Sequence, residues 1–228
     1  MRRWGWLPLL GLLSCSGLDE GEGGAVALEI EVPTPATVEV GDALQLSATA
    51  LDADGNPVAG APITWRAADP TVTVSATGLV TGVSVGTGRV QARNGSLGSN
   101  LVTITVIARA DTLILVGDSI RSVAADVTTS GDLVTALRTF SPDAPVGSRP
   151  VIYAITSPTP GTAPSVSLTG GVQADTVNTG TDGTVTGMQL LRLAGRPPVD
   201  SAIVTVRAER TRGAPVPGSG QRFIIRFE

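Results

Sequence analysis

The side chains that carry out most enzyme chemistry are scarce in this chain of 228 residues. It has no histidine and a single cysteine, Cys15, so neither a Ser-His-Asp triad nor a Cys-His pair can be built. A zinc or copper site rich in nitrogen or sulfur ligands is excluded for the same reason. Only carboxylates are left for acid–base work, and the sequence shows no pairing among them. We therefore predict no catalytic residue, no cofactor site and no enzymatic activity.

One group of oxygen-bearing side chains has a spacing found in calcium loops. Asp52, Asp54 and Asn56 lie two residues apart, as the first ligands of an EF-hand loop do. Pro57 then occupies the place where that loop needs glycine, and Ile63 the place of its bidentate glutamate. A hairpin turn is the alternative, and it accounts better for this Asp-Gly-Asn-Pro run. No metal site is predicted, and calcium binding at Asp52 and Asp54 stays an open alternative.

Other acidic residues also have structural explanations. Asp69-Pro70 and Asp118 stand where chain turns or caps are expected, with an acidic site as the alternative for each. Asp19, Glu20 and Glu22 follow the cysteine in a polar stretch and are expected to be solvated.

Aromatic residues would matter if the protein bound sugars, because sugar rings stack on exposed aromatic faces. Trp65 and Tyr153 are predicted to be structural core residues. Phe140 has no evident structural role, and it lies in an enlarged loop region that we expect from Thr128 to Ser148. A strand lengthened for packing accounts better for Phe140, and a binding insertion, the kind of place where binding function tends to sit, is the alternative.

The composition indicates an all-β protein. Hydrophobic residues make up 42% of the chain but aromatic residues only 3%, and there are 28 glycines and 16 prolines. From residue 25 onward, short alternating runs are separated by turn residues, which is typical of a β-sandwich or barrel. The run from Leu44 to Ala50 predicts one strand with Gln45, Ser47 and Thr49 facing solvent, and Val102 to Val106 predicts another.

Three short blocks recur in the same order along the chain. Val40-Gly41-Asp42 returns at 116–118, Pro62 to Trp65 at 150–153, and Gly78 to Gly82 at 183–187. The offsets are 76, 88 and 105 residues, so they grow while the order is kept. This pattern predicts two copies of one sandwich, the second enlarged by insertions of 12 and then 17 residues. Chance recurrence of such short blocks is the alternative.

The N-terminus, MRRWGWLPLLGLLSC, has a basic start, a short apolar stretch and a small residue before Cys15. The apolar stretch is shorter than the ~20 residues that a membrane-spanning helix needs. The segment resembles a bacterial lipoprotein signal peptide, which implies removal of residues 1–14 and lipidation (palmitate) of Cys15. An ordinary secretory signal with a chance cysteine is the alternative. Ser16 after the cysteine implies, by the same resemblance, a lipid anchor in the outer membrane.

Residues 15–25 then form a predicted flexible, acidic, glycine-rich tether. Without Arg2 and Arg3, the expected mature chain keeps 14 of the 16 basic side chains against 20 acidic ones. This negative balance argues against a nucleic-acid partner.

Residues 26–107 resemble the bacterial Ig-like group 2 domain. The matching features include Gly41-Asp42, Trp65, the run Gly78 to Gly82, and the closing strand up to Val106. In this resemblance Trp65 fills the space between the sheets, and Gly78 and Gly82 bracket a turn. Gly86-Thr87 is expected to start the next strand.

Residues 108–228 resemble, less closely, the group 1 Ig-like modules of invasin-type surface proteins. The matching runs are 147–153 and 179–185, with Gly180 and Val185 departing from that family's pattern. Final strands are expected at 202–208 and 223–227, the latter with Phe223, Ile225 and Phe227 on one face.

These resemblances imply two tandem Ig-like β-sandwich domains on a lipid anchor. The leading hypothesis is a non-enzymatic protein of the cell envelope that acts in adhesion or surface interaction, with a protein or glycan ligand. The alternative is a structural or accessory envelope subunit that spaces or presents another protein, with exposed edge strands available for pairing.

Overall fold

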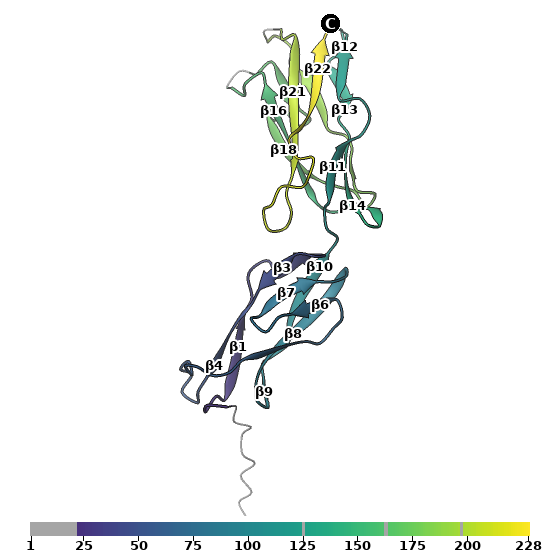
Figure 1. Ribbon diagram of the computed structural model, residues 1–228. Coiled ribbons are helices and arrows are strands. Elements are labelled where there is room, and N and C mark those ends of the chain that lie inside the picture. Colours follow the sequence, from purple (N-terminus) through teal and green to yellow (C-terminus); the bar gives the residue numbers. More distant parts are fainter. Residues whose placement is uncertain (1–21, 125, 162–163, 197) are drawn as a thin grey trace, which may run out of the picture.

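The computed structural model describes residues 22–228 apart from 125, 162, 163 and 197. In this part of the chain every regular element is a β-strand, which confirms the all-β fold predicted from the alternating pattern. Two sandwiches lie end to end, and the chain passes once from the first to the second (Figure 1). None of the described residues belongs to a helix that is long and apolar enough to cross a membrane.

The first domain contains strands β1 to β10 among the described residues. They are β1 (Ala27–Glu31), β2 (Thr37–Glu39), β3 (Ala43–Gln45), β4 (Ser47–Leu51), β5 (Thr64–Ala67), β6 (Val72–Val74), β7 (Leu79–Gly82), β8 (Gly86–Asn94), β9 (Leu97–Gly98) and β10 (Val102–Ile107). The largest sheet has the order β2-β10-β8-β5, with β9 paired to β8. It faces a sheet of order β3-β7-β6 and a β1-β4 pair.

The second domain contains β11 to β22. They are β11 (Thr112–Leu115), β12 (Ile120–Val123), β13 (Thr129–Asp132), β14 (Thr135–Phe140), β15 (Asp143–Pro145), β16 (Pro150–Ser157), β17 (Val166–Leu168), β18 (Ala174–Asn178), β19 (Thr184–Val185), β20 (Gln189–Arg192), β21 (Ser201–Ala208) and β22 (Gln221–Phe227). Its sheets have the orders β12-β22-β21-β16-β18, β13-β20-β17 and β11-β14-β15, with β19 paired to β14.

The two domains repeat one topology. In each, the largest sheet ends with a parallel pair, β2 with β10 and β12 with β22, while the neighbouring pairs are antiparallel. The middle repeat block, Pro62 to Trp65 and Pro150 to Tyr153, begins equivalent strands, β5 and β16. The pattern of sheets therefore supports a duplicated sandwich.

The other two repeat blocks do not occupy equivalent places, so the predicted correspondence was wrong there. Val40-Gly41-Asp42 follows β2, whereas residues 116–118 lie one strand earlier, between β11 and β12. Gly78 precedes β7, while Gly183 precedes β19, and the strand that corresponds to β7 in the sheets is β20. Both glycines close tight turns, with amide-to-carbonyl bonds from Gly78 to Ser75 and from Gly183 to Gly180. Because both runs need glycine at the same kind of turn, their sequences are similar even though they do not occupy equivalent positions in the two domains.

Three further expectations needed correction. The strand predicted from Leu44 to Ala50 is divided at Leu46 into β3 and β4, which pair with β7 and β1 in different sheets. The region from Thr128 to Ser148 is not a loop but holds β13, β14 and β15, so Phe140 ends a strand, as the favoured of the two interpretations predicted. Gly78 and Gly82 do not bracket a turn, because the residues from Leu79 to Gly82 form β7. A Cβ at Gly82 would lie 2.8 Å from the Glu39 carbonyl oxygen, so close packing explains this glycine.

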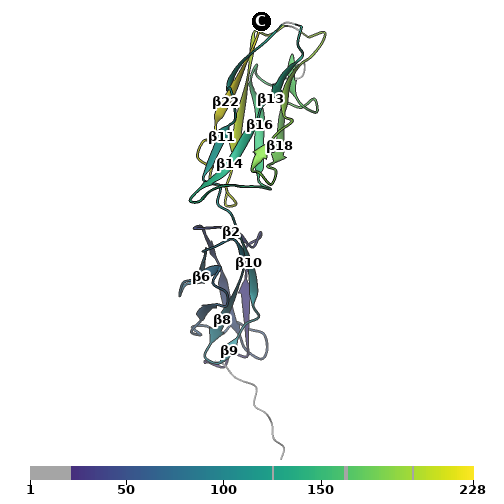
Figure 2. The same ribbon diagram turned by 90° about the vertical axis from the view of Figure 1, so that its right-hand side faces the viewer.

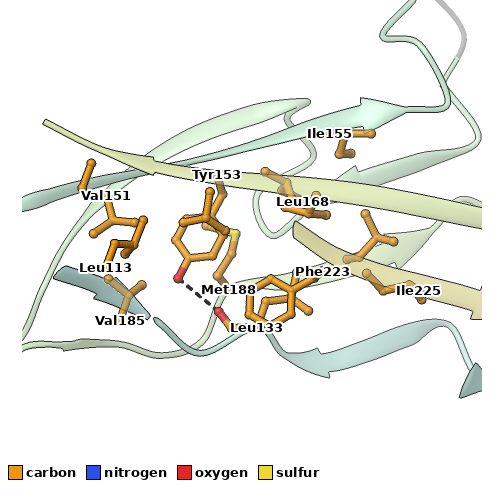
Figure 3. Close-up of a cluster of buried hydrophobic side chains, with 14 of the residues drawn as sticks. Leu113, Leu133, Val151, Tyr153, Ile155, Leu168, Val185, Met188, Phe223 and Ile225 are labelled. Carbon is orange, nitrogen blue, oxygen red and sulfur yellow. Dashed lines mark hydrogen bonds between the residues drawn. The ribbon is translucent and has the colours of Figure 1, made fainter. Parts of the chain in front are cut away.

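Each sandwich has its own hydrophobic core. The first core consists of Val38, Leu44, Leu46, Val72, Val80, Val90, Ile104 and Val106. The second is larger and includes Leu113, Leu133, Tyr153, Leu190, Phe223 and Ile225 (Figure 3). Phe223 and Ile225 are buried and Phe227 packs beside them, which confirms the face predicted for the last strand.

Candidate functional site

The predicted anchor lies outside the described residues. Cys15, the signal segment 1–14 and most of the predicted tether precede residue 22, where the described chain begins. Ala25, the last residue of that tether, is fully buried, and Val26 donates a backbone hydrogen bond to Leu51. The folded domain therefore includes the end of the stretch that the sequence predicted to be flexible.

The two predicted core aromatics differ in their surroundings. Tyr153 is fully buried, and its hydroxyl lies 2.6 Å from Thr135 Oγ1 and donates to the Leu133 carbonyl oxygen at 3.1 Å (Figure 3). Burial raises the pKa of Tyr153 to about 12. Trp65 is partly buried and packs on the first core, directly over Gly78, where a Cβ would lie 2.8 Å from its Cε2 atom.

The Asp52 region forms a hairpin turn. Asp52 Oδ1 accepts the backbone amides of Asp54 at 2.9 Å and Asn56 at 2.8 Å. The Asn56 amide contributes most to holding the pKa of Asp52 below its ordinary value. In the described part of the chain no three acidic, histidine or cysteine side chains are grouped closely enough to hold a metal ion.

Two other acidic residues singled out in the sequence, Asp69 and Asp118, take part in local structure, while Asp19 and Glu20 lie outside the described residues. Asp69 receives Arg89 Nε at 2.8 Å and Nη2 at 3.0 Å, and this pairing lowers the pKa of Asp69. The ion pair holds the start of β8 to the loop before β6. The backbone carbonyl of Asp118, in an exposed connection, accepts a hydrogen bond from Arg121.

The most unusual polar group is Glu39, the last residue of β2, which is only 1% exposed. Its carboxylate forms an ion pair with the Nη2 atom of Arg149, a residue in the connection before β16. Thr211, in the β21–β22 connection, donates to Glu39 Oε1 from its amide at 2.9 Å and from its hydroxyl at 3.1 Å. The amide of Ala110 lies 3.3 Å from Glu39 Oε2. These contacts place a buried carboxylate at the junction between the domains.

Further charged residues surround this contact. Arg109, in the segment that joins β10 to β11, lies 3.5 Å from Asp42 and 3.1 Å from Asp111. Arg210 Nε donates to the Ala110 carbonyl oxygen at 3.2 Å, and Arg212 donates to the carbonyl oxygen of Thr37 at 3.2 Å. The connection from 209 to 215 thus reaches from the second domain to both the linking segment and the first domain.

A cavity of about 630 Å³ opens beside the junction. Its wall comes from Val83 and Val85 before β8, from Ala108 and Arg109, and from Phe140 and Pro142 in the β14–β15 hairpin. Phe140 is 67% exposed, and its amide is held by Asp111 Oδ2 at 3.0 Å. Of the candidate residues that the sequence analysis singled out and the structure describes, Phe140 is the one that lines this cavity.

Neither Glu39 nor Arg149 was predicted from the sequence to be a site residue. Glu39 alternates with the inward-facing Val38 and Val40, so its strand position predicts an exposed side chain. Arg149 lies 110 residues further along the chain. Only the docking of the two domains brings these residues together.

Comparison with known proteins supports the assignment of the first domain. Residues 30–106 match the family model of the bacterial Ig-like domain (group 2), which confirms the family predicted for that domain. The match lies within the predicted range 26–107. Together with the sheet topology, it identifies the class of protein as tandem Ig-like β-sandwiches. No curated protein shows significant sequence similarity to the chain.

Several solved structures are similar to the chain. The adhesin InvE of Yersinia pseudotuberculosis is 18% identical, with 91% of this chain and 61% of that one covered and a TM-score of 0.42. The Escherichia coli adhesin FdeC is 17% identical, with 88% and 64% covered and a TM-score of 0.48. Domains 4 and 5 of the S-layer protein SbsC are 16% identical, with 89% and 98% covered and a TM-score of 0.33. The chain thus spans less than two thirds of either adhesin structure.

Proposed function

We propose that this chain is a non-enzymatic protein of the cell envelope that binds a protein partner through tandem Ig-like domains. The observation that carries the proposal is the end-to-end arrangement of the two sandwiches (Figures 1 and 2). The described chain begins at one end of the first domain, and the second domain extends away from it. An anchor before residue 22 would therefore hold the second domain out from the surface to which the chain is attached.

In this proposal Cys15 carries the lipid and the outer membrane is the site of attachment. The support is the N-terminal sequence, with its basic start, short apolar stretch and Ser16 after the cysteine. The non-enzymatic role is supported by the absence of histidine from the sequence and by the local structural use of Asp52 and Asp69. The excess of acidic side chains speaks against a nucleic-acid partner.

The cavity beside Phe140 is the surface we assign to the partner. It is continuous with the interface between the domains, and the exposed side chains at its rim, Val83, Val85 and Phe140, are apolar. Interface cores are enriched in aromatic and apolar groups, whereas a sugar also needs several directed hydrogen-bonding groups. We therefore expect an apolar side chain of a protein partner to enter this cavity, and a glycan is the competing outcome of the test.

Localisation is tested by membrane fractionation and protease treatment of intact cells. We expect the parent chain to be membrane-bound and cleaved from outside, and a Cys15→Ala variant to be released from the membrane. A Cys15→Ala variant that stays bound to the membrane would contradict the lipid anchor. A chain that is membrane-bound but protected would face the periplasm, and would favour the structural or accessory role over adhesion.

Binding is tested with the purified chain carrying Cys15→Ala as bait. A partner that enters the cavity should be retained by this chain, lost with Phe140→Ser, and kept with Ile120→Ser. Ile120 is a matched control because it is also an exposed apolar residue, in β12 and outside the cavity. Retention that is equal in all three chains, or retention of a glycan only, would contradict the proposed protein contact.

A further inference from the structure

The carboxylate of Glu39 is satisfied from outside its own domain. Its hydrogen bonds come from Arg149 and Thr211 of the second domain and from Ala110 of the linking segment. Among the described residues, no side-chain or backbone donor of the first domain is recorded on this carboxylate. Glu39 therefore depends on the second domain and the linking segment for the hydrogen bonds that replace its water.

Arg149 has the same dependence in reverse. Its side chain is 9% exposed, and among the described residues its other hydrogen-bond partners are neutral oxygen atoms, Thr211 Oγ1 at 3.0 Å and the Glu209 carbonyl at 3.4 Å. A buried charge that loses its partner carries a large desolvation cost, whereas a separated pair in water carries little. A tilt of the domains that broke the pair without admitting water would thus be strongly unfavourable. The pair favours one orientation over its near neighbours.

The linking segment is short and is held at both ends, which restricts such a tilt of the domains. Only residues 108–111 separate β10 from β11, and Ala110 is fully buried as part of the second domain's core. The Val40 amide donates to Ile107 on one side, and Arg210 holds the Ala110 carbonyl on the other. Both ends of the segment are therefore tied to a domain.

We propose that Glu39 is an orientation latch, which fixes the second domain against the first through Arg149 and Thr211. The latch makes the two sandwiches move as one elongated body. Because the wall of the cavity at Phe140 comes from both domains, the latch also sets the shape of that cavity. This inference concerns the mechanics of the chain and does not depend on its being an adhesin.

The test measures the distance between the domains by pulsed electron paramagnetic resonance. Cys15→Ala removes the only native thiol, and Ala76→Cys and Ala174→Cys then place one spin label on an exposed site of each domain. The parent should give one narrow distance distribution. Glu39→Gln removes the ion pair at nearly constant side-chain volume, and we expect a distribution about twofold wider or with a second maximum.

Asp69→Asn is the matched control. It makes the same carboxylate-to-amide change, at the ion pair with Arg89 inside the first domain, and should leave the distribution unchanged. Arg149→Met removes the latch from the other domain and should broaden the distribution as Glu39→Gln does. A folded Glu39→Gln or Arg149→Met chain with the parent's distribution would overturn the proposal. It would equally be overturned if both variants failed to fold, because the pair would then be needed for folding rather than for orientation.

Discussion

Tyr153 shows how a single polar atom is accommodated in an apolar core. Its ring lies among Leu113, Val151, Met188 and Phe223, and its hydroxyl donates to the Leu133 carbonyl oxygen (Figure 3). The same hydroxyl is hydrogen-bonded to Thr135 Oγ1. The surrounding low-polarity groups disfavour the charged phenolate, so the pKa rises to about 12. The chain has one tyrosine and no lysine, so few other groups titrate near this pH.

We predict that alkaline titration of the folded chain leaves Tyr153 protonated through pH 10. The unfolded chain releases this proton near pH 10.0 and the folded chain only near 12, so the folded state binds more protons between these values. Stability from this group is therefore full below pH 10 and falls by up to about 3 kcal/mol as the pH rises to 12. Near-ultraviolet tyrosinate absorbance with urea unfolding at each pH measures both quantities. Ionisation of the folded chain at pH 10 would contradict the prediction, and Tyr153→Phe is the control for the absorbance.

At the scale of the elements, the first domain depends on a strand that changes sheets at Leu46. The Leu46 amide donates to the Gly78 carbonyl oxygen at 2.9 Å, at the point where β3 ends and β4 begins. Gly78 has φ +82°, and a Cβ there would lie 2.7 Å from the Leu46 carbonyl oxygen and against the Trp65 ring. Glycine is required here both by the backbone conformation and by the close approach of two strands and a ring.

We predict that Gly78→Ala lowers the free energy of unfolding by about 3 kcal/mol or more, since it combines backbone strain with steric overlap. Gly55→Ala is the matched control, because Gly55 also has φ +82° but has open space around its Cβ position. It should cost only about 1–2 kcal/mol, from backbone strain alone. Urea unfolding followed by circular dichroism compares the two variants. Equal losses would mean that the packing over Gly78 contributes nothing.

At the scale of the whole molecule, the chain is two separate cores joined by a polar interface. The apolar clusters of the two domains share no residue, and the buried part of the contact between the domains is formed by Glu39, Arg149 and Thr211. Because both charges are almost fully buried, dissolved ions have little access to them. The Arg89–Asp69 pair differs, since the Arg89 side chain is 50% exposed.

We predict that the elongated shape of the molecule is insensitive to salt. Raising sodium chloride from about 0.05 M to about 1 M shortens the screening length from more than 10 Å to about 3 Å, which weakens exposed ion pairs but affects buried ones little. Small-angle X-ray scattering should give the same maximum dimension at both concentrations. A clear decrease at high salt would show that exposed charges, rather than the buried pair, hold the domains in line.

Local sequence patterns determined the elements of this protein and the class of its fold. Alternation of apolar and polar residues along short runs, with glycine and proline between them, predicted strands such as Val102 to Val106 and the buried face of β22, because strand periodicity is a local property. The glycine, aspartate and tryptophan positions of the first domain predicted its family. The same kind of turn occurs at Gly78 and at Gly183 in non-equivalent parts of the two domains. The similar local sequences there led to a wrong alignment of the repeats.

The tertiary structure alone decided the junction. Glu39 stands on the outward side of its strand, and its partners lie 110 and 172 residues away at Arg149 and Thr211. Pairing across such separations depends on how two complete domains dock, which no run of neighbouring residues encodes. Phe140 is the aromatic residue for which the sequence predicted no structural role. The docking of the domains makes it part of a cavity wall to which both domains contribute.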